Sequence, residues 1–161
     1  MTKPQPTIDT ILEQFFARQL AGKKGITLRR IEEVEENLRA CLESEAHRIL
    51  VTSDLLLLAA EREFDPTGAV SRVMHADDLI FVLSIFVQPQ WLPLDPVQRR
   101  AHLRLADALT GSLLGARLVN RDELCCPLLD IRAGIDRSKA ELRQERGRVS
   151  TGSRETSYRG R

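Results

Sequence analysis

Positively charged residues that could bind phosphate gather in two places in this sequence. The first place holds Lys23 and Lys24 in a connector bracketed by glycines, followed by Thr27, Arg29 and Arg30 at the expected start of a helix. Free backbone amides at a helix N-terminus, a hydroxyl group and several cations together form a corner that suits a phosphate group. We therefore expect this corner to contact a nucleic-acid backbone. The alternative is a solvated loop whose cations pair with nearby glutamates.

The second cluster consists of Arg99, Arg100 and Arg104, within a predicted helix over residues 95–115. Arg100 and Arg104 lie one turn apart, so both side chains leave the same outward face. We expect further contacts with nucleic acid here. An ordinary solvated helix face is the alternative.

Residues that could ligate a metal do not have the required spacing. A carboxylate-bridged di-metal site needs Glu three positions before His, and Glu43, Glu45 and His47 miss that spacing because a serine stands there. The adjacent Cys125 and Cys126 lack the gap that lets two thiolates reach one tetrahedral ion. We expect no metal and no cofactor, and we predict that both cysteines are buried as small apolar side chains.

Catalytic constellations are equally hard to build. His75 stands where a helix is expected to begin, and His102 lies between two arginines on a helix face predicted to be exposed, so both are expected to be structural. The sequence has no glycine-rich phosphate loop, nucleophile elbow or dinucleotide fingerprint. We predict that the protein is not an enzyme. A catalytic role for Cys125 or a histidine is the remaining alternative, because side chains that are distant in the sequence can meet in the folded protein.

Composition predicts the class of fold that must position these residues. The chain has 161 residues, of which 42% are hydrophobic and only 4% aromatic. This length suits one domain with one core, and an interior of Leu, Ile, Val and Ala favours packed helices over a sheet. We predict an all-α bundle of about five to six helices, with residues 1–146 as a single domain.

Charge is distributed unevenly along the chain. The formal net charge is +1, but residues 1–136 carry 16 basic and 20 acidic side chains, whereas residues 137–161 carry 8 basic and 3 acidic ones. An acidic body argues against a broad surface for polyanions, so any nucleic-acid contact should be confined to local patches or to the C-terminal segment.

Cysteine number and hydropathy indicate the compartment. Three cysteines do not make a disulfide framework, which favours a reducing environment. The first ten residues lack the apolar core of a signal peptide, and the longest apolar run, residues 79–87, is too short to cross a bilayer. We expect a cytoplasmic protein without membrane contact.

The N-terminal part, residues 7–64, is predicted to form a helical hairpin and a third helix. Thr7 can cap a helix over residues 7–20, and Thr27 can cap one over residues 27–42. The second helix has an apolar stripe at helical spacing, namely Ile31, Val34, Leu38, Cys41 and Leu42. A third helix is expected to start at Ser53 or Asp54 and to end near Glu63, and its four leucines predict burial on more than one side.

The remaining elements follow a turn at Asp65-Pro66-Thr67-Gly68. Within residues 69–118 we predict a central buried helix over 79–87 and an amphipathic helix over 95–115. Asp95 is the predicted N-cap of the amphipathic helix and Gly115 its predicted end. Its predicted inward stripe consists of Val97, Ala101, Leu105, Ala108 and Leu109. A weak helix over 128–146 is expected to fray or to need a partner. Residues 147–161 are predicted to be disordered, because Ser, Thr, Gly and Arg dominate them.

Residues 7–42 resemble the N-terminal core-binding domain of tyrosine recombinases and phage integrases. The resemblance rests on an amphipathic helix ending near Phe15-Phe16, a short basic loop, and Thr27-Leu28-Arg29-Arg30 opening a second helix. In that family this SAM-like module clamps DNA, which implies DNA contacts at the matching residues Lys23, Lys24, Thr27, Arg29 and Arg30. The family's catalytic domain has no counterpart, because no His-x-x-Arg occurs and Tyr158 is the sole tyrosine.

These observations lead to two competing interpretations. In the first, the protein is a non-catalytic helical domain that binds DNA or assists a DNA-processing partner. In the second, it is a protein-interaction or homodimerisation module, with residues 128–146 docking on a partner or on a second copy.

Overall fold

The computed structural model describes residues 4–152 and confirms the all-α class. Within that range it contains seven α-helices and no β-strand. The helices are α1 (Ile8–Leu20), α2 (Gly25–Glu45), α3 (Thr52–Phe64), α4 (Ala69–Val73), α5 (Ala76–Phe86), α6 (Pro96–Gly115) and α7 (Cys125–Gly152), with the 3₁₀ turns η1 (Ala46–Arg48) and η2 (Pro89–Trp91) between them. The short α4 is the helix that the sequence analysis did not anticipate.

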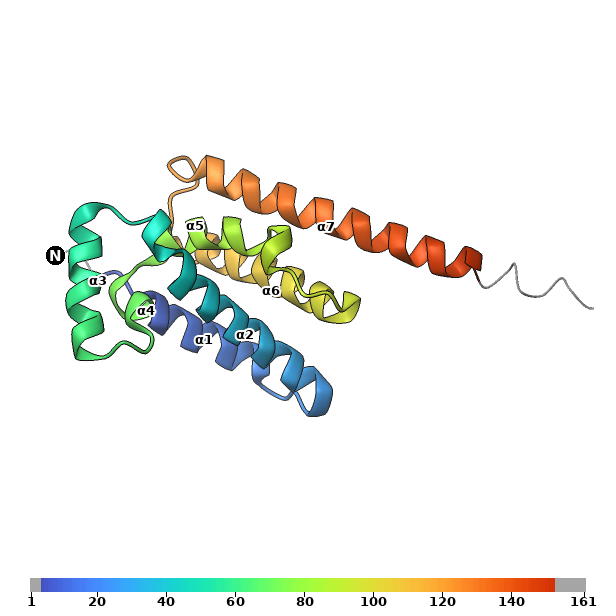
Figure 1. The fold of residues 1–161 in the computed structure, drawn as a ribbon, viewed down its shortest axis with the longest axis horizontal. Coiled ribbons are helices and arrows are strands. Elements are labelled where there is room, and N and C mark those ends of the chain that lie inside the picture. Colours follow the sequence, from blue (N-terminus) through green and yellow to red (C-terminus); the bar gives the residue numbers. More distant parts are fainter. Residues whose placement is uncertain (1–3, 153–161) are drawn as a thin grey trace, which may run out of the picture.

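Helix α5 occupies the centre of the bundle. It contacts α1, α2, α6 and α7, and six of its eleven residues are buried. Figure 1 shows the antiparallel α1–α2 hairpin on one side of α5 and the long α7 on the other, with α6 beside α5. The choice of a helix over a strand for this apolar run is confirmed, and buried hydrophobic residues from all seven helices form one core around it.

The α1–α2 hairpin matches its predicted pattern except at one cap. The Thr7 side chain accepts a hydrogen bond from the Thr10 amide, as a cap does, and the predicted stripe of α2 is buried throughout. However, α2 begins at Gly25, so Thr27 lies inside its first turn and its prediction as the cap is wrong. Gly22 and Gly25 adopt φ angles of 71° and 61°, which glycine tolerates and which shorten the connector.

The prediction that the leucines of α3 are buried on more than one side is wrong. Only Leu58 is buried, while Leu56 is 69% exposed and Phe64 is 90% exposed. The helix also starts at Thr52, before either predicted cap. α3 lies at one end of the molecule and packs mainly on α4, so only one of its faces is covered (Figure 1).

The predicted turn before α4 and both predicted ends of α6 are confirmed. The Thr67 amide donates to Asp65 Oδ1 over 3.0 Å, and Gly68 has a φ of 71°. Asp95 Oδ2 accepts from the Gln98 amide over 3.1 Å, and α6 ends at Gly115.

The inward face of α6 is rotated from its predicted position. Leu105 and Leu109 are buried as expected, but Val97 and Ala108 are exposed, and His102, predicted to be exposed, is fully buried. α6 contacts α2, α5 and α7, so its covered face is wider than that of a helix packed on one neighbour. His102, which contacts Phe86 of α5, was therefore assigned to the wrong side.

Helix α7 is longer than predicted and has its partner within the chain. Its residues Ile131, Ile135 and Leu142 are buried, and it packs on α5 and α6. It continues to Gly152, so the prediction of disorder is wrong for residues 147–152. The remainder of the predicted tail, residues 153–161, lies outside the described residues. Figure 1 shows the C-terminal half of α7 projecting beyond the bundle.

The hydropathy and length of the helices bear on whether the chain could span a membrane. Within residues 4–152, none of them combines the length and the apolar character that crossing a membrane requires.

The close approach of α5 and α7 generates a stability prediction. A Cβ atom at Gly134 would stand 2.7 Å from Val87 Cγ2 and 3.3 Å from the Val87 carbonyl oxygen, whereas a Cβ at Gly111 meets nothing within 4 Å. Gly111→Ala should raise the free energy of unfolding by about 1 kcal/mol through helix propensity, and Gly134→Ala should lower it by about 1–2 kcal/mol because overpacking outweighs that gain. Urea unfolding measures both. Equal stabilisation by the two changes would contradict the α5–α7 packing.

Candidate functional site

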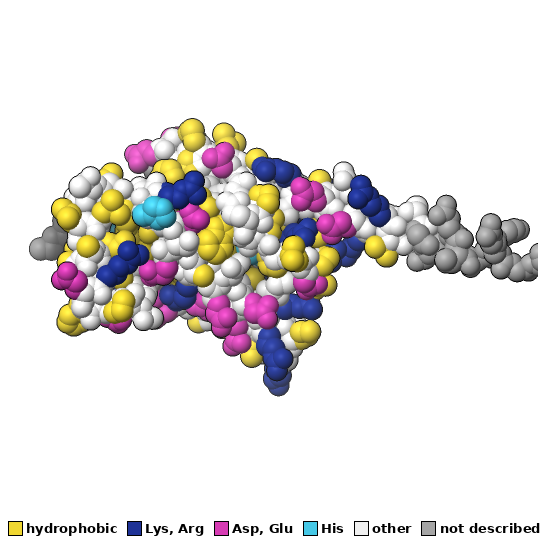
Figure 2. Space-filling model, in the orientation of Figure 1, with side chains coloured by type: hydrophobic (Ala, Val, Ile, Leu, Met, Phe, Trp, Pro, Cys, Tyr) yellow, Lys and Arg dark blue, Asp and Glu magenta, His cyan; other side chains and the backbone are white. Residues whose placement is uncertain are grey.

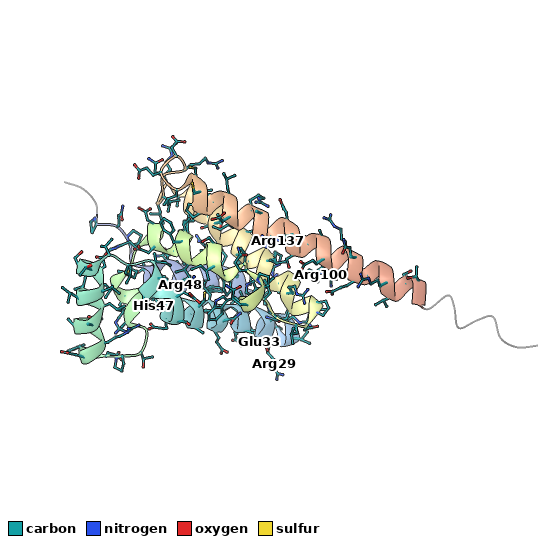
Figure 3. All side chains as sticks on the ribbon, turned by 45° about the horizontal axis from the view of Figure 1, so that its top comes forward. Arg29, Glu33, His47, Arg48, Arg100 and Arg137 are labelled. Atoms are coloured by element: carbon teal, nitrogen blue, oxygen red, sulfur yellow. The ribbon has the colours of Figure 1, made fainter. Side chains whose placement is uncertain are left out.

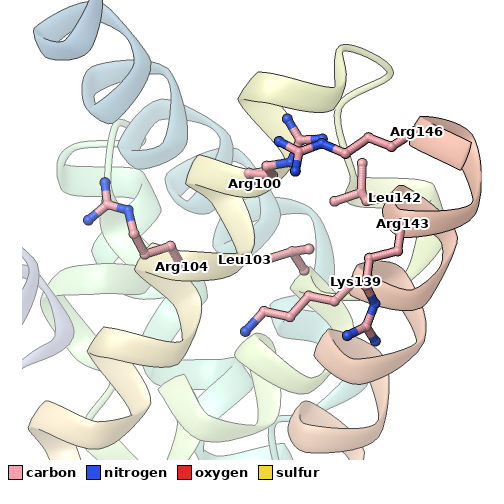
Figure 4. A pocket seen from close by; sticks show the side chains of 7 residues that line it. All are labelled: Arg100, Leu103, Arg104, Lys139, Leu142, Arg143 and Arg146. Atoms are coloured by element: carbon pink, nitrogen blue, oxygen red, sulfur yellow. The ribbon is translucent and has the colours of Figure 1, made fainter. Parts of the chain in front are cut away.

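A groove between α6 and α7 gathers positive charge on an apolar floor. Its volume is about 420 Å³, and its lining consists of Arg100, Leu103, Arg104, Lys139, Leu142, Arg143 and Arg146. Figure 4 shows Arg100 and Arg146 extending from opposite helices into the same end of the groove, whereas the Arg104 guanidinium points away from α7. The arrangement can hold an anion that also presents an apolar surface.

Helical spacing explains why these side chains share one groove. Arg100, Leu103 and Arg104 follow the i, i+3, i+4 pattern on α6, and the four lining residues of α7 follow i, i+3, i+4, i+7. The leucines of the two helices are buried against the core, which fixes the rotation of each helix. The cations next to the leucines are then directed to the rim.

No acidic partner neutralises this cluster within the described part of the chain. None of the five groove cations has a side-chain nitrogen within 4.0 Å of a carboxylate oxygen of a described residue. Glu141 and Glu145 of α7 lie on other faces of that helix, and Glu145 is paired with Arg99. The groove therefore carries an uncompensated positive charge.

Arg99 does not belong to this surface, although it was grouped with Arg100 and Arg104. Its side chain is only 13% exposed, and its guanidinium donates to the carbonyls of Pro93 and Leu94 and to Glu145. These bonds tie the start of α6 to α7, so Arg99 positions the helices that form the groove.

The predicted corner at the start of α2 is present as an exposed basic surface. Lys23, Lys24, Thr27 and Arg29 are exposed and Arg30 is half-buried. Lys24 precedes the helix without any side-chain cap, and no salt bridge within residues 4–152 involves the corner's cations. The expected pairing with nearby glutamates is therefore not seen there.

The two basic clusters lie on the same half of the molecule. Gln98 Nε2 donates to the Arg30 carbonyl over 2.9 Å, which joins the first turn of α6 to the second turn of α2. Figure 3 shows Arg29 and Arg100 on that half and His47 and Arg48 on the other, and Figure 2 shows further Lys and Arg side chains along α7. The sequence analysis missed Lys139, Arg143 and Arg146, although their spacing on a predicted helix was a usable signal.

Two of the three cysteines have thiols with a raised pKa. Cys125 and Cys126 are exposed, so the prediction that they are buried is wrong. The hydrogen bond with Cys125 raises the pKa of the Cys126 thiol, and burial raises the pKa of Cys41 to about 12. Both shifts oppose formation of a reactive thiolate.

His102 is held neutral inside the protein. Its ring stacks on Phe86 at a centroid distance of 3.8 Å, and Nε2 lies 2.8 Å from the Phe86 carbonyl oxygen. Burial lowers the pKa of His102 to about 4, although the bond to Phe86 acts in the opposite direction. The other ring nitrogen, Nδ1, is buried without a hydrogen-bond partner among the described residues.

Burial of neutral His102 makes stability depend on pH. The ordinary pKa of 6.5 applies in the unfolded chain and about 4 in the folded one, so only the unfolded chain takes up this proton between those values. The free energy of unfolding should fall by about 3 kcal/mol from this residue as pH drops from 7 to below 4. His102→Gln should remove that part of the slope in denaturation series. An NMR titration of His102 with a midpoint near 6.5 would contradict the burial.

Comparisons with known proteins leave the function to be inferred from this geometry. No family model matches the chain, and no curated protein or solved structure is significantly similar to it. The resemblance of residues 7–42 to the recombinase domain thus stays a prediction.

Proposed function

We propose that the protein is a non-catalytic domain that binds nucleic acid, with the α6–α7 groove as its principal contact surface. The observation that carries this proposal is the set of five groove cations, none of which forms a salt bridge with a carboxylate of the described residues. A phosphate backbone is the ligand that gains most from such a cluster, because each contact releases condensed counterions.

The dimensions of the groove favour a chain of phosphates over a single anion. Lys139 and Arg146 are seven residues apart on α7, which corresponds to about 10 Å along a helix. One strand of DNA carries a phosphate for every 3.4 Å or so of helix axis, so this length can face several of them. The leucine floor suits the apolar surface of a sugar or an unstacked base.

The corner at the start of α2 supports the same proposal as a secondary contact. Arg30 of the corner is joined to the first turn of α6 through Gln98, and the corner's cations are among the residues that the recombinase resemblance implicates in DNA contact. Glu32, Glu33 and Glu36 are exposed further along α2, so contact with a polyanion should be confined to the first turn. Binding would then involve one basic half of the molecule.

We also propose that the protein is not catalytic. The support is that two glutamates with catalytic potential are used in structural hydrogen bonds and that His102 and Cys41 are buried. Glu43 accepts from the Val70 amide and from Arg62, and Glu45 accepts from the Trp91 indole and from Arg48. These carboxylates hold the bundle together, and neither His102 nor Cys41 is exposed.

A reducing, cytoplasmic location also remains part of the proposal. It is supported by the three cysteines, all of which are free thiols in the described residues.

The groove generates a binding prediction with a matched control. The full-length double variant Arg100→Glu with Arg143→Glu should lose at least ~10-fold in affinity for duplex or single-stranded DNA at low salt, with a smaller salt dependence. The single variant Arg143→Glu should account for much of that loss, whereas Arg137→Glu, the same change of two charge units on the opposite face of α7, should lose far less. Fluorescence anisotropy of labelled DNA over a salt series measures both. Equal losses would indicate binding through overall charge rather than through the groove.

The corner is tested separately with Lys24→Glu and Arg29→Glu, two exposed sites where a charge change leaves the core intact. A loss smaller than that of the groove variant is expected. If the corner variant alone abolished binding, the groove would not be the principal surface.

A protein-interaction function is the second candidate, and the exposed face of α3 favours it. In the predicted docking segment, residues 128–146, the stripe of Ile131, Ile135 and Leu142 is already buried within the chain, on the side packed against α5 and α6. On α3, however, Leu56, Leu57, Ala60 and Phe64 form an exposed stripe at helical spacing. Such a stripe could associate with a second copy of the chain.

This candidate predicts a mass that rises with protein concentration. Leu56→Glu should abolish the rise, whereas Leu129→Glu should not, although Leu129 is 68% exposed and Leu56 69%. Sedimentation equilibrium distinguishes the two. A constant monomer mass for the unmodified protein would exclude homodimerisation through α3 at the concentrations tested.

A further inference from the structure

A second pocket, chemically unlike the basic groove, opens between α2, η2 and α6. It has a volume of about 430 Å³, which is within the range of small-molecule sites. Its lining includes Glu33, Val34, Asn37, Trp91, Gln98 and His102. Neither proposed function uses this pocket.

His102 is one of the lining residues, and its ring has a buried nitrogen without a partner among the described residues. The Phe86 carbonyl can only accept a hydrogen bond, so Nε2 must carry the proton and donate it over 2.8 Å. In the neutral ring Nδ1 is then an acceptor, and it is buried with no partner among residues 4–152. Buried acceptors are nearly always hydrogen-bonded, so a donor is expected to reach this nitrogen.

The two amides that line the pocket also leave acceptors available. Asn37 Nδ2 donates to the Trp91 carbonyl over 3.0 Å, and Gln98 Nε2 donates to the Arg30 carbonyl over 2.9 Å. These bonds identify the nitrogen of each amide, and therefore its oxygen. Neither oxygen has a hydrogen bond to the described residues, so the polar wall consists mainly of acceptors.

Charge at the pocket's rim has the sign that complements a cation. Glu33 is exposed and forms no salt bridge with a described residue, and it has Glu32 and Glu36 nearby on α2. Figure 3 shows Glu33 on α2, one turn after Arg29, and Figure 2 shows acidic side chains gathered over this helix. Trp91 adds an aromatic surface that attracts cations, and Val34 adds an apolar one.

We propose that this pocket binds a small organic cation whose charged group carries N–H donors, such as an amidine, a guanidine or a primary amine attached to an apolar body. The charged group lies near Glu33 and the amide oxygens, and one N–H donates to His102 Nδ1. The apolar body rests on Trp91 and Val34. The proposal is independent of nucleic-acid binding, because the site and its charge differ from those of the groove.

Trp91 is the only tryptophan, so its fluorescence reports directly on the pocket. Benzamidine, the neutral benzamide and the anionic benzoate are titrated into the full-length protein. Benzamidine should give a saturable change, with benzamide at least ~10-fold weaker and benzoate without effect, because only the cation complements Glu33. Equal responses to the three compounds would overturn the proposal.

Two variants test which groups form the site. Glu33→Gln should weaken benzamidine binding about tenfold, and Glu32→Gln, an adjacent and exposed control outside the lining, should leave it unchanged. Equal affinity of Glu33→Gln and the unmodified protein would overturn the role of charge.

The role of His102 is tested in the unmodified protein, which avoids a variant that fails to fold. In an ¹⁵N spectrum of the imidazole, benzamidine should shift the Nδ1 resonance while Nε2 stays protonated. An Nδ1 resonance that already shows a hydrogen bond and does not respond to saturating benzamidine would mean that the nitrogen holds an interior water only, and would overturn the proposed contact. DNA binding of the Glu33→Gln variant should stay normal in either case.

Discussion

Burial of the apolar helix α5 is the constraint on which the rest of the structure depends. Leu79, Ile80, Leu83 and Phe86 are inaccessible to solvent, and burying each large apolar side chain contributes about 1.5–3 kcal/mol. No single neighbour can cover a helix that is apolar on several sides. α1, α2, α6 and α7 therefore all pack on it, and their own positions follow from that requirement.

The basic groove is a consequence of this packing rather than of attraction between its residues. Its five cations repel one another, and no described carboxylate offsets them. They are held together because Leu103 and Leu142 are buried on the core side of α6 and α7, which leaves the neighbouring cations at the rim. Gly134 allows α7 to approach Val87 closely, and Arg99 joins the start of α6 to Glu145 of α7. An anionic ligand would relieve the repulsion that the core imposes.

The same core divides the surface into regions of different chemistry. Arginines and Lys139 line the groove on one side of α6, whereas Gln98 and His102, on the side facing α2, contribute to a pocket of hydrogen-bond acceptors. A third region, the leucine face of α3, lies outside the bundle because α3 packs mainly on α4. These regions are separate enough for one to be altered without the others.

Local pattern by itself determined six of the seven helices, the Thr7 cap of α1, both ends of α6 and the buried stripe of α2. The Asp95 cap, the Gly68 turn and the α2 stripe involve residues within a few positions of one another, so their energetics can be read along the chain. The groove could be predicted only in part. Arg100 and Arg104 were found by spacing, but their meeting with Lys139, Arg143 and Arg146 depends on how α7 packs. Only the tertiary structure decided that His102 is buried, that the α3 leucines are exposed and that Arg99 faces inward. Each of these outcomes depends on which other helices pack on the helix concerned. That packing is set by the burial of α5 against helices distant in sequence, so a short stretch of sequence does not contain the information.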